Sequence, residues 1–184
     1  MRHALKLHPD SRSQAASRIE VETRRTGVGM ALRYIVTGTI GDLALPSRAR
    51  SQRADDLWKH TCFEAFVRGV GDEAYCEFNF SPSTEWAAYR FSKYRRENAL
   101  DIAEVNAPAI VLRDSPTHFQ MDVAIDLTRV SELPRRAPWR AGVAAVIEEK
   151  NGQKSYWALA HPQGKPDFHH ADGFVLQLPP AEQR

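Results

Sequence analysis

The chain has 184 residues, of which 42% are hydrophobic and 26% charged, with a formal net charge of +2 and a pI near 8.6. This length fits one domain over residues 1–184, with ends near 1–16 and 179–184 that we expect to be frayed, and the mixed charges give no argument for a nucleic-acid partner. No segment reaches the roughly 18 apolar residues of a membrane span, and the basic N-terminus lacks an apolar signal core, so we predict a cytoplasmic protein with no membrane partner.

The first half of the chain begins with two stretches in which apolar and polar residues alternate. Ile19–Arg25 and Met30–Ile40 show this period of two, with a turn at Gly27–Gly29 between them. Such alternation is typical of half-buried strands. The polar, arginine-rich segment Leu45–Asp56 follows, and its composition predicts a long loop or lid.

The most informative segment is Leu57–Ser83, which predicts two strands joined by a glycine-containing loop. If the apolar faces of the two strands align, Glu64 lies directly opposite Glu77. Like charges that face each other across a strand pair are destabilising, so a polar binding site accounts for them better than a plain surface does. The same sheet face is predicted to carry Phe66, Tyr75 and Asn79, with Trp58 entering beside them.

The same alternation places the two cysteines on opposite faces of this hairpin. Cys62 falls on the polar face and Cys76 on the core face. Side chains on opposite faces of a strand pair cannot reach disulfide geometry, so we predict two free thiols. A nucleophilic Cys62 activated by the nearby His60 is an alternative.

The second half of the chain predicts further short strands separated by turn signals. Leu127–Leu133 is expected to form a short helical turn, and Asn151-Gly152 is the strongest hairpin signal. In total, about ten short strands and no long amphipathic helix predict an all-β fold, an antiparallel β-sandwich of jelly-roll or immunoglobulin-like type. The expected strands are Trp86–Tyr94, Ile110–Asp114, His118–Asp126, Arg140–Lys150, Ser155–Leu159 and Phe174–Leu178.

The polar face of the predicted hairpin has the residue types that bind a sugar. A sugar ring stacks its C–H face on an aromatic plane and donates its hydroxyls to carboxylates and amides. We therefore predict a ligand-binding group made of Trp58, Glu64, Glu77 and Asn79. Two alternatives stay open: a surface on which the glutamates pair with arginines such as Arg90, and a glycosidase in which they flank the scissile bond.

A second group of polar residues lies in the segment 158–174. Asp167, Phe168 and His169 are predicted to contact the ligand, because loops on a rigid sandwich often carry function. The alternatives are a solvated loop and a metal site. The irregular spacing of the histidines and the adjacency of His169 and His170 disfavour a metal site.

No cofactor is predicted, although calcium and haem stay open. Met30 and Met121 lie in apolar strand patterns and are predicted to be core residues rather than haem ligands. The chain has no Cys-x-x-Cys-His attachment motif, no phosphate-binding glycine loop and no Rossmann fingerprint.

One stretch of the chain suggests a family. The segment Asp55–Phe91 resembles DOMON-like domains and the related family-nine carbohydrate-binding modules. The resemblance lies in the run DDLWKHTCFEAFV and the later run AYCEFNFSPSTEWAAYRF. The matching features are the acidic entry Asp55-Asp56, the acidic strand residue Glu64, and the turn from Asn79 to Pro82. The resemblance implies a sandwich that binds a ligand without catalysis, with Trp58 and Glu64 in the positions of the first sugar-stacking tryptophan and its carboxylate. It gives no match for a second tryptophan.

Taken together, these features predict a non-catalytic small-molecule binder, with a carbohydrate or related polyol as the partner. The alternatives are a haem- or redox-cofactor-binding domain, an enzyme that uses Glu64 and Glu77 or the histidine-rich loop, and a protein–protein interaction module. The oligomeric state is not predicted.

Overall fold

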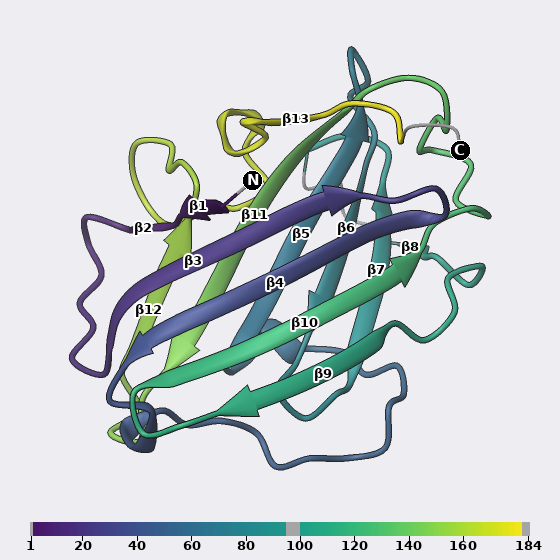
Figure 1. The fold of residues 1–184 in the computed structure, drawn as a ribbon. Coiled ribbons are helices and arrows are strands. Elements are labelled where there is room, and N and C mark those ends of the chain that lie inside the picture. Colours follow the sequence, from purple (N-terminus) through teal and green to yellow (C-terminus); the bar gives the residue numbers. More distant parts are fainter. Residues whose placement is uncertain (1, 95–99, 182–184) are drawn as a thin grey trace.

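The computed structural model describes residues 2–94 and 100–181, and within them thirteen strands form two antiparallel sheets packed face to face (Figure 1). One sheet has five strands and the other has eight. The predicted all-β antiparallel sandwich is therefore confirmed. In spatial order the five-stranded sheet contains β1 (Arg2–Ala4), β3 (Ala16–Arg25), β4 (Gly29–Gly38), β10 (His118–Asp126) and β9 (Ala109–Asp114).

The eight-stranded sheet forms the second layer and is the one that positions the candidate site. Three short 3-10 helices lie in the connections: η1 (Ile40–Asp42), η2 (Leu57–Lys59) and η3 (Ala171–Gly173). The sheet contains, in spatial order, β2 (Lys6–Leu7), β12 (Lys154–Ala158), β11 (Trp139–Glu148), β5 (Cys62–Gly69), β6 (Tyr75–Phe80), β7 (Trp86–Phe91) and β8 (Leu100–Asp101), with β13 (Leu176–Leu178) also paired to β11. None of the described helices has the length and apolar character needed to cross a membrane.

The core lies between the two sheets and is rich in aromatic rings. Phe63 of β5 lies 4.9 Å from the ring of Tyr34 and stacks on Phe119 at 5.8 Å. The buried Tyr34 hydroxyl donates to the backbone carbonyl of Glu64 at 2.8 Å, which satisfies its hydrogen-bonding group and ties the sheets together. Met30 and Met121 are fully buried here, so the prediction that they are core residues is confirmed.

The register of the β5–β6 hairpin differs from the predicted one. Glu64 pairs with Asn79, and Glu77 pairs with Phe66, so the prediction that the two glutamates face each other directly is wrong. A shift of two residues changes every cross-strand partner but keeps each side chain on its predicted face. The observed register places an amide, rather than a second carboxylate, directly opposite Glu64 and so reduces like-charge repulsion.

Other segments follow the prediction with local differences. Leu127–Leu133 forms two successive hydrogen-bonded turns rather than a helix, from Val130 to Leu127 and from Leu133 to Val130. Asn151-Gly152 lies in the turn between β11 and β12, where Gly152 has a φ of 84°. Residues 2–7, within the N-terminal segment expected to fray, pair as β1 with β3 and as β2 with β12. Residues 182–184 of the C-terminal end lie outside the described residues.

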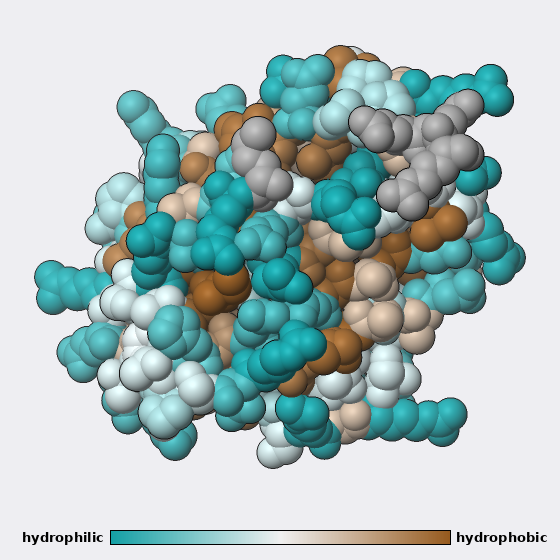
Figure 2. Space-filling view, in the orientation of Figure 1, coloured by the Kyte–Doolittle hydropathy of each residue, from teal (hydrophilic) through white to brown (hydrophobic). Residues whose placement is uncertain are grey.

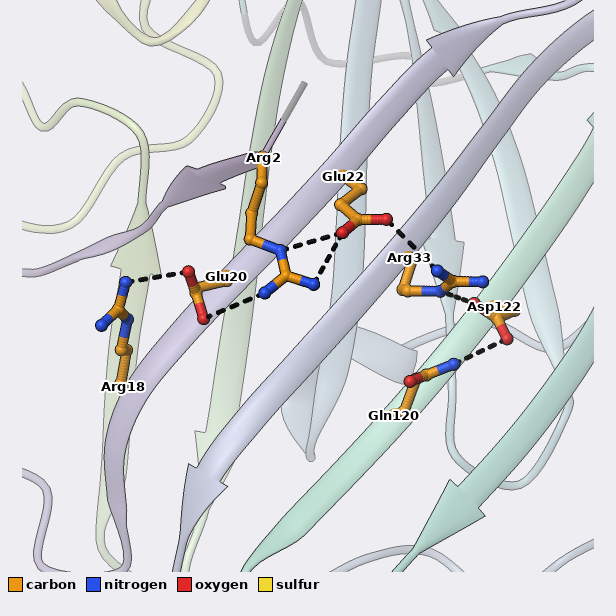
Figure 3. Close-up of polar contacts among 7 residues, drawn as sticks. All are labelled: Arg2, Arg18, Glu20, Glu22, Arg33, Gln120 and Asp122. Atoms are coloured by element: carbon orange, nitrogen blue, oxygen red, sulfur yellow. Dashed lines mark hydrogen bonds and ion pairs between the residues drawn. The ribbon is translucent and has the colours of Figure 1, made fainter.

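The outer face of the five-stranded sheet is covered by paired charges. Figure 2 shows hydrophilic side chains across this face, with hydrophobic areas between them. Figure 3 shows an ion pair within β3, from Arg18 to Glu20, and ion pairs between strands, from Arg2 to Glu22 and from Arg33 to Glu22 and Asp122. Gln120 adds a 2.8 Å hydrogen bond to Asp122. On this face each of these carboxylates has a basic partner.

Candidate functional site

The candidate site lies on the outer face of the eight-stranded sheet. Strand alternation points the even-numbered residues of β5 and the odd-numbered residues of β6 away from the core. These positions carry two carboxylates and an amide, yet Glu64 is 3%, Glu77 5% and Asn79 0% exposed. Burying polar groups in this way costs free energy unless they are compensated, so their partners decide what the face is for.

The segment 159–175, here called the tail loop, covers part of this outer face. Its residues Phe174 and His169 pack against aromatic rings of the sheet. The His169 ring lies 5.1 Å from both Phe66 and Phe91, and Tyr75 stacks on Phe91 at 4.8 Å. Together they form an aromatic cluster beside the glutamates.

A glycine in β11 allows the tail loop to lie directly on the sheet. A Cβ atom at Gly142 would come within 2.8 Å of the carbonyl oxygen of Gly173, a separation that real Cβ atoms do not show. Gly142 pairs with Phe66 of β5, so the close approach takes place next to the aromatic cluster. A larger residue here would lift the tail loop off the sheet.

A chain of polar contacts links the tail loop to β6. The Tyr75 hydroxyl lies 2.8 Å from Nδ1 of His169, and Nε2 of His169 lies 3.8 Å from Oε2 of Glu77. A neutral imidazole that accepts from Tyr75 at Nδ1 carries its proton on Nε2, which faces Glu77. Asn79 Nδ2 in turn donates to Oε1 of Glu77 at 2.8 Å. Glu77 is therefore held from both sides.

Two buried acceptors at this site lack hydrogen-bond donors among the described residues. They are Oε1 of Glu64 and Oδ1 of Asn79, which belong to residues paired directly across the hairpin. The amide orientation of Asn79 follows from its donation to Glu77, which leaves its oxygen as the unused atom. Buried polar atoms without partners are rare in native proteins, and each one calls for an explanation.

The surroundings of Glu64 favour its neutral form. Burial raises the pKa of the Glu64 carboxyl well above its usual range, and the charge of Glu77 raises it further. The same two influences, burial first and then the carboxylates, raise the pKa of the Cys62 thiol. Both shifts favour the neutral forms, the protonated carboxyl of Glu64 and the thiol of Cys62.

The structure brings Glu64, Glu77, Asn79 and His169 together, and it places Trp58 on η2 beside the hairpin. The Trp58 indole is 51% exposed, and the Lys59 ammonium lies 5.7 Å from its ring. The loop before η2 is tied to β7, because the Tyr89 hydroxyl donates to Oδ1 of Asp55 at 2.7 Å. Trp58 thus offers an accessible aromatic plane at the Cys62 end of β5.

Asp167 and Phe168 lie in the tail loop next to His169, and Phe168 packs against the aromatic cluster. Asp167 accepts from the Tyr94 hydroxyl and from the backbone N–H of His169, the latter at 3.1 Å, so it holds the tail loop around His169. The Phe168 ring lies near Tyr156 and His161, at 6.2 and 6.4 Å. A direct ligand contact for either residue stays a prediction.

Two of the alternatives raised by the sequence are contradicted by the partners that the structure shows. Arg90 points to the other face and pairs with Glu104 and Glu132, each at 2.8 Å, so the expectation that it neutralises the two glutamates is wrong. His60 Nδ1 lies 2.7 Å from Glu148, which is its partner in place of Cys62. Both cysteines are free and buried, as predicted.

The histidines of the tail loop turn toward separate partners. His161 Nε2 lies 2.8 Å from the carbonyl of Lys6, and His170 Nδ1 accepts from the backbone of Asp172 at 3.2 Å. Within residues 2–94 and 100–181, no three His, Cys, Asp or Glu side chains converge as a metal-binding group.

Several residues of the site were not singled out by the sequence. Tyr89 and Phe91 occupy outer-face positions of β7, and Tyr94 follows that strand. Strand alternation in β7 could have found the first two, but the run WAAYRF does not alternate clearly between apolar and polar residues. Tyr94 reaches the tail loop through its hydroxyl contact with Asp167 and a ring contact with His170 at 6.2 Å, and no sequence pattern predicts either contact.

No protein-family model matches this sequence, and no curated protein matches it. Solved structures of similar fold include a protein of Bacteroides uniformis described as a candidate carbohydrate-binding protein, with a TM-score of 0.69 and 14% identity over 97% of this chain and 85% of that one. The chain has the fold of a family 9 carbohydrate-binding module. The module from Caldicellulosiruptor kristjanssonii in complex with cellotriose gives a TM-score of 0.66 and 8% identity, over 100% of this chain and 84% of that one. Its glucose complex gives 0.62 and 9%, over 98% and 86%.

Proposed function

We propose that this protein binds a carbohydrate or a related polyol without breaking bonds, on the outer face of the eight-stranded sheet. The observation that carries the proposal is the pair of buried acceptors, Glu64 Oε1 and Asn79 Oδ1, that have no donor among the described residues. Hydroxyl groups of a bound sugar supply such donors. Buried acceptors without donors lower the stability of the free protein, and we attribute this arrangement to ligand binding.

The residues around these acceptors suit a sugar ring. When it holds its proton, which burial favours, the Glu64 carboxyl can both donate to and accept from a hydroxyl. The half-exposed Trp58 indole offers a plane for the C–H face of the ring. Support for the class of ligand comes from the fold, since two structures that share it were solved with cellotriose and glucose. The DOMON-like resemblance of Asp55–Phe91 also supports ligand binding rather than catalysis.

The experiment is a thermal-shift screen followed by calorimetry with glucose, cellotriose and a set of other mono- and oligosaccharides. A ligand at 100 times its Kd stabilises the protein by about 2.7 kcal/mol, which is readily detected. Trp58→Ala is expected to weaken binding by about tenfold through the loss of stacking. Val111→Ala removes an exposed apolar side chain from the other sheet and serves as the control, with affinity unchanged.

The proposal is wrong if no sugar shifts the transition and Trp58→Ala changes no binding signal. A second result would also overturn it: turnover of a glycoside by the wild-type protein that Glu64→Gln abolishes. That result would assign the two carboxylates to bond cleavage.

A further inference from the structure

A pocket lies at the end of the sandwich where β3 turns into β4 and β10 ends (Figure 1). Its volume of about 700 Å³ is in the range of small-molecule sites. Three arginines line it: Arg25 at the end of β3, and Arg135 and Arg136 in the segment between β10 and β11. We call it the arginine pocket. It shares no residue with the proposed sugar site.

Arg25 fixes the backbone on the far side of the arginine pocket. Its Nη1 donates to the carbonyl of Ala137 at 2.6 Å, and its Nη2 donates to the carbonyls of Pro134 and Arg135 at 2.8 and 2.7 Å. The guanidinium also lies 3.6 Å from the ring centre of the buried Trp139, whose indole N–H donates to the same Pro134 carbonyl at 2.8 Å. The backbone that carries the other two arginines is therefore held in place without a ligand.

No carboxylate of the described part of the chain lines this pocket or forms an ion pair with its arginines. Burial lowers the pKa of Arg25, and no neighbouring carboxylate offsets that shift. Hydrogen bonds from Thr128 and, more weakly, the charge of Arg135 lower the pKa of Asp126, but Asp126 is not among the lining residues. Positive charges gathered in this way repel one another, and an anion placed between them removes that repulsion.

A phosphate group matches these donors better than a carboxylate does. Guanidinium groups bind both anions through charge-assisted hydrogen bonds, which are roughly twice as strong as neutral ones. A carboxylate carries one charge, which one arginine can match, whereas a phosphate monoester carries nearly two charges and three acceptor oxygens and can bridge two arginines. The Thr26 hydroxyl also lines the pocket. It accepts from the backbone N–H of Gly29 at 2.9 Å and keeps its own proton to donate.

The remaining wall of the pocket can hold the body of a small molecule. Val28 is 56% exposed and lines the pocket together with the buried Leu127. The volume is also far larger than an inorganic phosphate ion fills. Nucleic-acid sites are typically basic stripes or broad patches, so a hollow of this kind favours a small ligand.

We propose that the arginine pocket binds the phosphate group of a phosphorylated small molecule. Arg135 and Arg136 contact the phosphate oxygens from the backbone that Arg25 fixes, and Thr26 donates to a further oxygen. No bond of the ligand is broken. This site goes beyond the proposed sugar binding, and neither proposal depends on the other.

The test compares phenyl phosphate, phenyl sulfate and inorganic phosphate by calorimetry at about pH 7.5, above the second phosphate pKa of about 6. Phenyl phosphate and phenyl sulfate have nearly the same shape but carry two charges and one. Sodium chloride holds the ionic strength constant, because salt screens exposed charges. We expect phenyl phosphate to bind about tenfold more tightly than phenyl sulfate. It should also bind more tightly than inorganic phosphate, because its ring packs on Val28.

Variants locate the binding site. Arg135→Gln and Arg136→Gln each remove one exposed guanidinium and are expected to fold as the wild type does. Each should weaken phenyl phosphate binding by about tenfold, and the double variant should weaken it further. Arg48→Gln is the matched control. It removes an exposed arginine from the loop that follows β4 at its other end and should leave the affinity unchanged.

Four results would overturn the proposal. The first is a wild-type protein that binds phenyl phosphate no better than chloride at equal ionic strength. The second is phenyl sulfate binding as tightly as phenyl phosphate, which would show that the pocket does not select phosphate. The third is wild-type affinity in the double variant, which would place the phosphate elsewhere. The fourth is a single-stranded oligonucleotide that binds through these two arginines while phenyl phosphate does not, which would assign the pocket to nucleic acid.

Discussion

The two outer faces of the sandwich carry similar residue types, but their charged side chains differ in exposure and in pairing. On the five-stranded sheet, arginines and carboxylates alternate between neighbouring strands and form exposed ion pairs, such as Arg33 with Asp122 at 2.6 Å (Figure 3). On the eight-stranded sheet, Glu64 and Glu77 are buried, and among the described residues no basic side chain forms an ion pair with Glu64. The carboxylates drawn on the first face pair within the chain, whereas on the second face Oε1 of Glu64 and Oδ1 of Asn79 have no donor among the described residues.

This difference indicates that the fold loses stability in favour of binding on the outer face of the eight-stranded sheet. Exposed ion pairs cost little and contribute little, because water screens them. Buried acceptors without donors cost free energy that the rest of the sandwich must supply. The contrast between the two faces can be tested by variants that alter one face at a time.

The largest effect is expected from Glu64→Gln, measured as the free energy of unfolding against pH. Well below about pH 4.3, the ordinary glutamate pKa, Glu64 is protonated in both the folded and the unfolded state and its raised pKa costs nothing. Above that pH the unfolded chain ionises while the folded protein does not, so the wild type loses about 1.4 kcal/mol per pH unit until the folded pKa is reached. The variant lacks this loss.

Urea unfolding of both proteins at about pH 4, 6 and 8 measures this effect, and the advantage of Glu64→Gln should grow with pH. Glu20→Gln on the five-stranded sheet is the matched control and should show no such growth. An advantage that stays constant over this range would mean that Glu64 is not protonated in the folded protein.

A smaller effect is expected from Gly142→Ala, which changes how the tail loop covers the eight-stranded sheet. The added methyl group would meet the Gly173 carbonyl at 2.8 Å, so the loop must shift, at a cost of about 1–3 kcal/mol. Gly27→Ala is the control, because a Cβ atom there meets nothing within 4 Å. Unfolding midpoints and the affinity for the ligand check this prediction, and equal midpoints for the two variants would show that the tail loop does not pack on β11.

The smallest effect is expected on the other face. A double-mutant cycle of Arg33→Ala and Asp122→Ala should give a coupling of about 0.2–1 kcal/mol that falls with added salt. Neither single variant should alter ligand affinity. A coupling free energy well above this range, or a loss of ligand binding in either variant, would contradict the interpretation that this face carries only surface ion pairs.

Much of the fold follows from the alternation of residue types. Phe63, Glu64 and Ala65 take opposite faces whatever strand they pair with, because successive side chains of a strand point to opposite sides. For this reason the placement of Glu64, Glu77 and Asn79 on one face was predictable even though the predicted register was wrong by two residues. The free thiols of Cys62 and Cys76 follow from the same rule.

The partners within the site were less predictable. His169 reaches Tyr75 and Glu77 only because the tail loop folds back over the sheet at Gly142. The alternative in which Arg90 pairs with the glutamates stayed open because the alternation in β7 is unclear and did not show on which face Arg90 lies.

By itself the sequence determined the class of fold and the face on which each strand residue lies, because both depend on local backbone geometry and on the burial of apolar side chains. Only the tertiary structure decided that Oε1 of Glu64 and Oδ1 of Asn79 are buried with no donor among the described residues, and that Glu20, Glu22 and Asp122 pair with arginines on the five-stranded sheet. Burial and pairing depend on which distant segments of the chain come into contact. The alternation of apolar and polar residues within a strand does not predict those contacts.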